Sequence, residues 1–416
     1  MRALLPALLF SLSLSLVPLG ARRANHAAGV SAGQNDPSQE PTEPATPERW
    51  PIDVENWTTP ESGWLYVLDS KPDANAPGGC IWLLDPGSGK VKGRIRTGGH
   101  ADFALSPDGS TLYVASDAGG DSSDLAVIDT AQGMVVDRAT IAERAVADAP
   151  MPFSTMAVSG DGSTLRILIE TPGSGDAESY LLAAFDTRSG DFLPGSVHLG
   201  NCGPGRFISY PTADQFDFLC PRTNKIRLIN VDDHSNTVRN SEVVFPWERR
   251  VGVAEALEDS SGQTIAIVRG DGAIVTMDIA RLEFDATKTG PDLPSRIFPA
   301  VWPTSPDGSK IYLGYRAVYE RASDNRFYLD YGRPPNVRPA GTTPKEFRVY
   351  DTRTWRKIGT IGTKMSFWSA VAGNDGRWLY AMVPKKHSIL VIDTVAMRQT
   401  GTINIGGMPT LAMVAP

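Results

Sequence analysis

The sequence predicts an all-β protein, a seven-bladed β-propeller of four-stranded antiparallel sheets. Three observations support this prediction: an apolar run that repeatedly ends in aspartate, a turn motif that precedes many of these runs, and chain ends that complement each other. Repeats of about 45 residues with several strand signals in each unit are typical of β-propellers. We therefore expect each repeat to form one blade.

The repeated aspartate occurs seven times along the chain. Four of the six intervals between successive aspartates are 42 to 46 residues long, and the other two are 57 and 73. An aspartate at the end of a strand starts a hairpin turn because its side chain can bond the backbone that follows, and several of these hairpins have glycine four residues later. Structural roles are therefore expected for Asp85, Asp129, Asp186, Asp232, Asp278, Asp351 and Asp393.

A second motif predicts the turn between the first two strands of a blade. It is Ser-Pro-Asp-Gly at 106–109 and 305–308, and related forms occur at 159–162 and 374–376. Proline sets φ for a turn, aspartate can bond its own backbone, and glycine accepts a positive φ. An alternating apolar run such as 111–115 follows each motif and predicts the second strand.

The two ends of the chain together supply one complete blade. Residues 65–69, 81–85 and 90–96 predict only the second, third and fourth strands of a blade. The missing first strand is found at residues 409–414, after a complete last blade. Pairing of these N- and C-terminal strands would close the ring and remove an exposed sheet edge.

The propeller is assigned to residues 61–416, and the first sixty residues are expected to lie outside it. Residues 1–23 contain a leucine-rich apolar stretch between basic residues, which is typical of a secretory signal peptide. An uncleaved membrane anchor is the alternative, since the stretch is just long enough to span a bilayer. Residues 24–60 are rich in Pro, Ala and Glu, so we expect a flexible leader. The protein is accordingly predicted to be periplasmic, with no other membrane segment.

The charge of the chain limits which partners it can bind, and its cysteines bear on the compartment in which it folds. The net charge is −7 and the charges are dispersed, which argues against a nucleic-acid or anionic-membrane partner. Cys202 and Cys220 flank two apolar runs that predict adjacent strands, so a disulfide between them is expected in an oxidising compartment. Cys80 would then be an unbridged, half-buried strand residue.

The sequence predicts no catalytic, cofactor-binding or metal-binding residue on this chain. The five histidines are scattered, and no pair of them has metal-ligand spacing. Carboxylates are plentiful, which leaves a hydrolase with paired carboxylates open.

An insertion at residues 315–338 lies within the longest interval between the repeated aspartates and is rich in Arg and Tyr. Both residue types are enriched at protein interfaces, and long loops on rigid scaffolds often have functional roles. A solvated hairpin extension is the alternative interpretation. The candidate partner-interface residues are Trp302, Tyr315, Arg316, Tyr319, Arg321, Arg326, Tyr328 and Tyr331.

Four stretches of the chain resemble the heavy, β-propeller subunit of quinoprotein amine dehydrogenases, the methylamine and aromatic amine dehydrogenases. More broadly, the chain resembles seven-bladed propellers with YVTN-type repeats. The stretches are 66–70 with 82–85, 200–202 with 208–220, 298–302 with 310–313, and 378–380 with 392–411. The segment 71–79 departs from the family pattern because it lacks an aromatic residue, and 117–124 is short where the family has an Arg-rich insertion.

The resemblance implies that this chain is the large subunit of a periplasmic amine dehydrogenase, an oxidoreductase that oxidatively deaminates a primary amine. It implies a heterotetramer of two large and two small chains. In that family the small subunit contains the tryptophan tryptophylquinone and performs the chemistry, and a cupredoxin accepts the electrons. This chain would be a scaffold that forms part of the substrate channel. The alternatives are a stand-alone secreted propeller for binding or scaffolding and a lactonase-like propeller hydrolase.

Overall fold

The structure is a computed structural model that describes residues 52–416 with internal gaps. Between residues 194 and 344 it describes little beyond the strands. The chain divides into two compact units, 1–46 and 47–416, and every described residue belongs to the second. The predicted signal peptide, 1–23, lies outside the described residues. No helix in the described part of the chain is long and apolar enough to cross a membrane.

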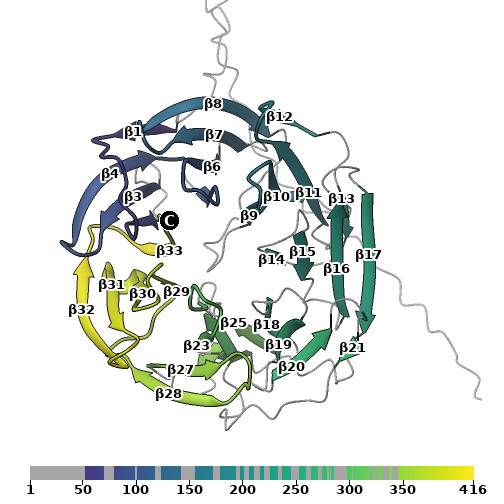
Figure 1. The fold of residues 1–416 in the computed structure, drawn as a ribbon, viewed down its shortest axis with the longest axis vertical. Coiled ribbons are helices and arrows are strands. Elements are labelled where there is room, and N and C mark those ends of the chain that lie inside the picture. Colours follow the sequence, from purple (N-terminus) through teal and green to yellow (C-terminus); the bar gives the residue numbers. More distant parts are fainter. Residues whose placement is uncertain are drawn as a thin grey trace, which may run out of the picture. The chain divides into compact units, whose positions relative to one another are not determined.

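Antiparallel sheets follow one another around a ring in Figure 1, which is the arrangement of a β-propeller. The first sheet has the order β33 (Pro409–Val414), β2 (Leu65–Asp69), β3 (Cys80–Asp85), β4 (Lys90–Arg96) and β1 (Asp53–Glu55). The second has the order β5 (Ala101–Leu105), β6 (Thr111–Asp117), β7 (Ser123–Asp129) and β8 (Met134–Ile141). The third has the order β9 (Met156–Val158), β10 (Thr164–Thr171), β11 (Ser179–Asp186) and β12 (Asp191–Phe192), and β13 (Val197–Gly200) also pairs with β11.

Three further four-stranded sheets complete the set of large sheets. One has the order β18 (Val253–Glu258), β19 (Thr264–Arg269), β20 (Ile274–Asp278) and β21 (Glu283–Phe284). The next has the order β22 (Phe298–Val301), β23 (Lys310–Arg316), β27 (Glu346–Asp351) and β28 (Lys357–Gly362). The last has the order β29 (Ser369–Ala372), β30 (Trp378–Val383), β31 (Ser388–Asp393) and β32 (Arg398–Asn404).

The predicted number of seven blades is corrected to six. Where the repeat ending at Asp232 predicted a complete blade, the described residues form two separate two-stranded sheets. These are β14 (Arg206–Ser209) with β15 (Phe216–Leu219), and β16 (Lys225–Asp232) with β17 (Thr237–Val244). No ladder joins β15 to β16 within the described strands. The repeat motif predicts hairpins, whereas a four-stranded sheet also requires pairing between hairpins, which the motif does not encode.

The predicted ring closure is confirmed. β33 pairs with β2 in antiparallel register, with Leu65 opposite Val414 and Leu68 opposite Leu411. The backbone N–H of Ala415 also donates to the carbonyl of Trp64 at 2.8 Å. The last strand of the chain is therefore the neighbour of β2, near the start of the described residues, in one sheet.

The predicted leader boundary at residue 60 is also corrected. β1 pairs with β4 and adds a fifth strand to the first sheet, and Ile52 beside it is fully buried. Arg96 forms an ion pair with Asp53 at 2.9 Å across this pairing. A three-residue strand with two acidic residues has no apolar alternation, which explains why the sequence pattern did not indicate it.

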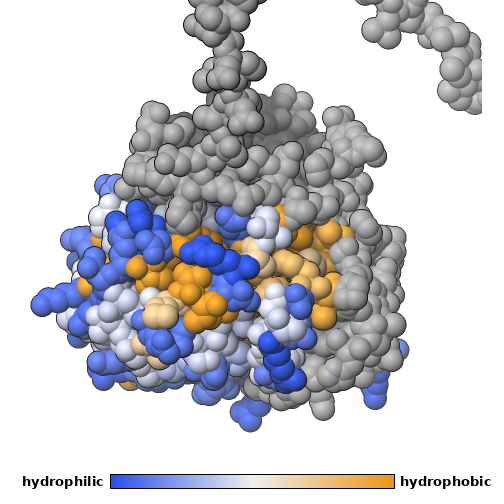
Figure 2. Space-filling view, turned by 90° about the horizontal axis from the view of Figure 1, so that it is seen from above, coloured by the Kyte–Doolittle hydropathy of each residue, from blue (hydrophilic) through white to orange (hydrophobic). Residues whose placement is uncertain are grey.

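The apolar core lies between adjacent sheets. Tyr66 and Leu83 of the first sheet pack in one cluster with Phe103 and Val114 of the second. A separate cluster joins the last sheet to the first and includes Ile403. The exposed large apolar side chains include Val91 on β4, Met134 and Val136 on β8, and Ile358 on β28. Figure 2 views the side on which β1 and β8 lie in Figure 1 and shows apolar areas among hydrophilic ones.

Candidate ligand cleft at the ring closure

The repeated aspartates have structural roles where the structure describes their side chains. Asp85 Oδ1 accepts the backbone N–H of Gly87 at 2.9 Å, and Asp393 Oδ1 accepts those of Val395 and Ala396 at 2.9 and 2.8 Å. Hydrogen bonds from the Ser88 hydroxyl and from backbone N–H groups lower the pKa of Asp85. Equivalent bonds to backbone N–H groups occur at Asp129, Asp186, Asp278 and Asp351. The side chain of Asp232 lies outside the described residues.

The threonine that follows four of these aspartates has a role that sequence reasoning missed. Thr130 Oγ1 donates to the carbonyl of Gly109 at 2.7 Å, which ties the second hairpin of the blade to its first turn. Thr187, Thr352 and Thr394 make the same bond to Gly162, Gly308 and Gly376. The recurring Asp-Thr dipeptide was the available signal. However, the glycine carbonyl that each threonine hydroxyl bonds lies 18 to 44 residues earlier in the chain.

The structure brings some of the predicted interface residues into an additional sheet. β24 (Val318–Arg321) pairs on one side with β25 (Arg326–Leu329) and on the other with β26 (Val337–Pro339). In this register Tyr319 is opposite Tyr328 and Arg321 is opposite Arg326. Tyr315 and Arg316 belong to β23 instead. Trp302, Tyr331 and the predicted Cys202–Cys220 disulfide lie outside the described residues.

A buried carboxylate lies where β33 begins. Asp69, 1% exposed, accepts the backbone N–H of Met408 at 2.6 Å and the indole N–H of Trp82 at 3.3 Å. Its Oδ2 is also 3.6 Å from the sulfur of Cys80, the buried residue at the start of β3. These contacts link the closing strand to the neighbouring strands of the first sheet.

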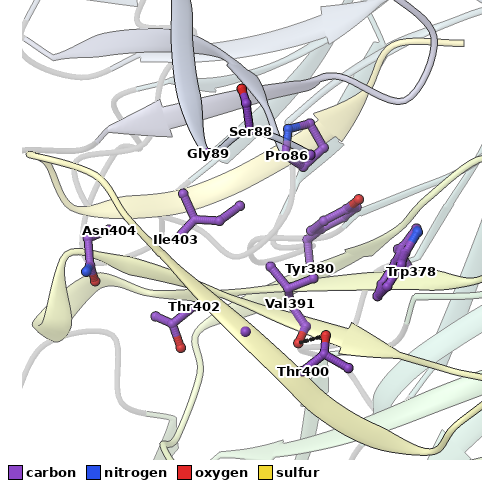
Figure 3. Close-up of a pocket in the computed structure, with 12 residues that line it drawn as sticks. Pro86, Ser88, Gly89, Trp378, Tyr380, Val391, Thr400, Thr402, Ile403 and Asn404 are labelled. Carbon is purple, nitrogen blue, oxygen red and sulfur yellow. Dashed lines mark hydrogen bonds between the residues drawn. The ribbon is translucent and has the colours of Figure 1, made fainter.

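A cleft of about 560 Å³ lies where the first and last sheets meet. Figure 3 shows that the β3–β4 turn, with Pro86, Ser88 and Gly89, forms one side of it. Strands β30, β31 and β32 of the last sheet form the other side. Its lining residues are Pro86, Gly87, Ser88, Gly89, Trp378, Tyr380, Val391, Thr400, Gly401, Thr402, Ile403 and Asn404.

Two aromatic side chains of β30 line this cleft. Trp378 is half-buried, and the Arg377 guanidinium lies over its ring, 4.9 Å from the centroid. Tyr380 is buried, and this burial raises the pKa of its hydroxyl to about 12. The carboxylates of Asp375 and Asp85 add to the rise in the Tyr380 pKa.

Polar groups of β32 and of the β3–β4 turn complete the cleft. Thr400, Thr402 and Asn404 of β32 are exposed. The register places Thr402 and Asn404 on the face of β32 opposite to that of Gly401, which shares its face with Val391 and Tyr380. Thr400 Oγ1 donates to the carbonyl of Val391 at 3.2 Å (Figure 3). Ser88 Oγ donates to Asp85 Oδ2 at 2.5 Å, which leaves its lone pairs able to accept.

The described residues contain no group of three or more His, Cys, Asp or Glu side chains that could hold a metal ion. Sequence reasoning did not predict the cleft, because its two sides come from opposite ends of the chain. Trp378 and Tyr380 belong to one of the stretches that resemble the amine dehydrogenase family, and no role in binding was predicted for them. The cleft therefore depends on the ring closure.

Comparison with known proteins shows similarity at the level of fold. No family model matches the chain, and no curated protein sequence matches it either. A functionally unknown protein from Desulfotomaculum acetoxidans is similar over 85% of this chain and 99% of its own, with a TM-score of 0.57 and 12% identity. A proposed 6-phosphogluconolactonase from Bacteroides fragilis is similar over 86% and 99%, with a TM-score of 0.55 and 13% identity.

Two further solved structures are also similar. Hydrazine synthase of Kuenenia stuttgartiensis matches over 76% of this chain and 89% of its own, with a TM-score of 0.54 and 16% identity. The dihydro-heme d1 dehydrogenase NirN, in complex with DHE, matches over 87% of this chain and 66% of its own, with a TM-score of 0.50 and 15% identity. Likeness at such identities indicates fold alone. The chain is therefore similar to known β-propeller proteins, and its fold is that of a β-propeller.

Proposed function

We propose that this chain is a propeller scaffold that binds a partner protein through the sheet formed by β24, β25 and β26, hereafter the extension. The extension is inserted between β23 and β27, which pair directly with each other in the blade. The blade is thus complete without the extension. An added sheet that the blade does not need for its own pairing is the observation on which the proposal depends.

The strand register of the extension supports a protein partner. Cross-strand partners occupy the same face of a sheet, so Arg321 and Arg326 share a face with Tyr319 and Tyr328. Arg and Tyr are residue types enriched in binding hot spots.

In its specific form, the proposal makes this chain the large subunit of an exported amine dehydrogenase. The partner would be a small subunit that contains tryptophan tryptophylquinone, and two large and two small chains would assemble in the periplasm. A cupredoxin would accept the electrons. Support for this form comes from the four sequence stretches that resemble the family, and the chemistry would take place on the partner chain.

The alternatives differ from this form in what the purified chain does alone. A stand-alone binding propeller would purify as a single colourless species. A lactonase-like hydrolase, suggested by the fold shared with the Bacteroides fragilis protein, would open lactones without a second polypeptide.

The test is purification of the tagged full chain from its native host, followed by mass spectrometry and absorption spectroscopy. The proposal predicts a small exported polypeptide in stoichiometric amount, and its specific form also predicts quinone absorbance and amine-dependent dye reduction. A variant in which residues 317–345 are replaced by a short glycine-rich turn should fold but lose the partner. Val136→Ser, on the exposed outer strand β8, is the control and should retain it.

A single species with no associated polypeptide would contradict the scaffold proposal. A stoichiometric partner without quinone absorbance would support the scaffold but overturn the amine dehydrogenase form. Equal recovery of the partner with the variant that lacks the extension would show that binding occurs elsewhere.

A further inference from the structure

Four blades have a buried tyrosine at an equivalent position of their second strand. Tyr66, Tyr113, Tyr312 and Tyr380 each pair across the sheet with the residue two before the hairpin aspartate of the same blade. All four are at most 5% exposed. A tyrosine buried to this degree usually has a polar group beside its hydroxyl.

For three of these tyrosines, the next blade around the ring supplies that polar group. The threonine of its Asp-Thr dipeptide lies beside the tyrosine hydroxyl: Thr130 at Tyr66, Thr187 at Tyr113 and Thr394 at Tyr312. Burial raises the pKa of each tyrosine, and the threonine hydroxyl partly offsets the rise. The same threonine hydroxyls also bond the turns of their own blades.

The threonine is missing where the last sheet meets the first. Tyr380 packs against the first sheet, in which Asp85 is followed by Pro86. Burial and the carboxylates of Asp375 and Asp85 raise the pKa of Tyr380 to about 12, and no hydrogen bond from a described residue offsets this rise. Figure 3 shows the Tyr380 hydroxyl directed towards the side of the cleft on which Pro86 lies. A buried hydroxyl therefore ends in the cleft where the other blades place a threonine.

The cleft around this hydroxyl fits a small molecule that has an apolar body and one oxygen acceptor. Its volume of about 560 Å³ lies within the range of roughly 300–1,000 Å³ that is usual for small-molecule sites. Val391, Gly401 and Ile403 share the face of the last sheet on which Tyr380 lies, and Val391 and Ile403 give it apolar surface. A phenol that keeps its proton at neutral pH donates a hydrogen bond, and a carbonyl or hydroxyl oxygen can accept it. Such an oxygen is neutral, as is the threonine hydroxyl at the equivalent contacts.

We propose that this cleft binds a small cyclic ketone or alcohol whose oxygen accepts a hydrogen bond from Tyr380. The apolar ring of the ligand would lie against Val391, Ile403 and Pro86. Gly401 leaves room for it, since an added Cβ there would meet only Val391, at 3.8 Å. The site lies between the first and last sheets and is independent of the partner proposed for the extension.

Saturation-transfer NMR and titration calorimetry with the full chain test the proposal. The probes are cyclohexanone, camphor and borneol, and at least one of them should show saturation transfer and a measurable Kd. Tyr380→Phe removes only the hydroxyl and should weaken the binding by about threefold or more. Tyr113→Phe is the matched control: it removes the equivalent hydroxyl where Thr187 already lies beside it, and should leave the Kd unchanged.

Pro86→Thr gives a second test, because it restores the Asp-Thr dipeptide in the first blade. The new hydroxyl would lie beside Tyr380 and should weaken ligand binding by about tenfold or more. Urea unfolding should remain cooperative, since the dipeptide occurs in four other blades. The proposal would be overturned if none of the three probes bound the folded protein, or if Tyr380→Phe or folded Pro86→Thr bound as tightly as the native chain. If Pro86→Thr does not fold, the comparison of Tyr380→Phe with Tyr113→Phe decides.

Discussion

Four threonine hydroxyls connect the two hairpins of a blade at the scale of single residues. Each follows a hairpin aspartate and donates to the carbonyl of the glycine in the preceding turn, at 2.6 to 2.7 Å. These glycines have φ values of 66° to 75°, which an L-residue seldom adopts. The threonine hydrogen bond thus stabilises a turn whose positive φ is readily adopted only by glycine.

Thr352→Val should destabilise the protein by about 1 kcal/mol, because valine keeps the shape but leaves the Gly308 carbonyl without its donor. Urea unfolding would measure the loss. Thr360→Val, at an exposed position of β28, is the control and should change the free energy of unfolding by less than about 0.5 kcal/mol. Equal effects of the two substitutions would show that the Thr352 bond contributes nothing.

Acid should weaken the turns through Asp161 and Asp307. Hydrogen bonds from the serine two residues earlier, and then from backbone N–H groups, lower both pKa values to about 2. A carboxyl whose folded pKa lies below its unfolded value of about 3.9 stabilises the fold above that value. This stabilisation is lost as the pH falls from about 4 to 2.

The double variant Asp161→Asn, Asp307→Asn should therefore show a flatter dependence of unfolding free energy on pH than the native chain between pH 5 and pH 2. Urea titrations at several pH values would measure the two slopes. Asp191→Asn, an exposed change outside the turn motifs, serves as the control and should keep the native slope. Indistinguishable slopes for the double variant and the native chain would contradict the prediction.

At the scale of elements, the strand β33 is positioned by its contact with Asp69. The Met408 N–H bonds Asp69, and a Cβ added at Gly407 would lie 1.8 Å from Asp69 Oδ2. No side chain fits at position 407 unless the carboxylate or the chain moves. The glycine therefore allows the chain to pass the buried carboxylate before β33 begins.

Gly407→Ala should destabilise the protein by about 1–3 kcal/mol, as expected for an overpacked site. Gly406→Ala is a closely matched control, since a Cβ there meets no atom within 4 Å. Thermal unfolding followed by circular dichroism would compare the two. A melting temperature of Gly407→Ala equal to that of Gly406→Ala would mean that Asp69 can move aside without cost.

At the scale of the whole molecule, both ends of the described chain stabilise the first sheet. β33 supplies its innermost strand, while β1 adds an outer one. After β1, the Trp57 indole N–H donates to the Thr130 carbonyl at 2.8 Å, so the N-terminal segment also bridges to the second sheet. Closing contacts of this kind remove exposed strand edges.

Deletion of residues 409–416 should abolish cooperative unfolding and cause aggregation, because it exposes the edge of β2 and the core between the first and last sheets. Trp57→Ala should have a smaller effect, about 1–3 kcal/mol, with cooperativity retained. Calorimetry and light scattering would measure both. Cooperative unfolding of the truncated chain at the native temperature would contradict a closing role for β33.

The sequence by itself determined the strands, the hairpin turns and the pairing of the chain ends. Alternating apolar residues and the chemistry of Asp, Pro, Thr and Gly act over a few residues, so they are visible in the local pattern. The local pattern therefore predicted β2, β3, β4, β6 and β33 with bounds close to those observed. The closing strand β33 could be predicted because the first repeat contains only three of the four strands of a blade.

Only the tertiary structure decided the number of complete blades, the contribution of β1 and the cleft. β15 and β16 each form a hairpin, but whether two hairpins join depends on contacts between them, which no local motif encodes. β1 is stabilised by pairing with β4, 39 or more residues away, although its own sequence is polar. Trp378 and Ser88 line the same cleft because ring closure brings the two ends of the propeller together.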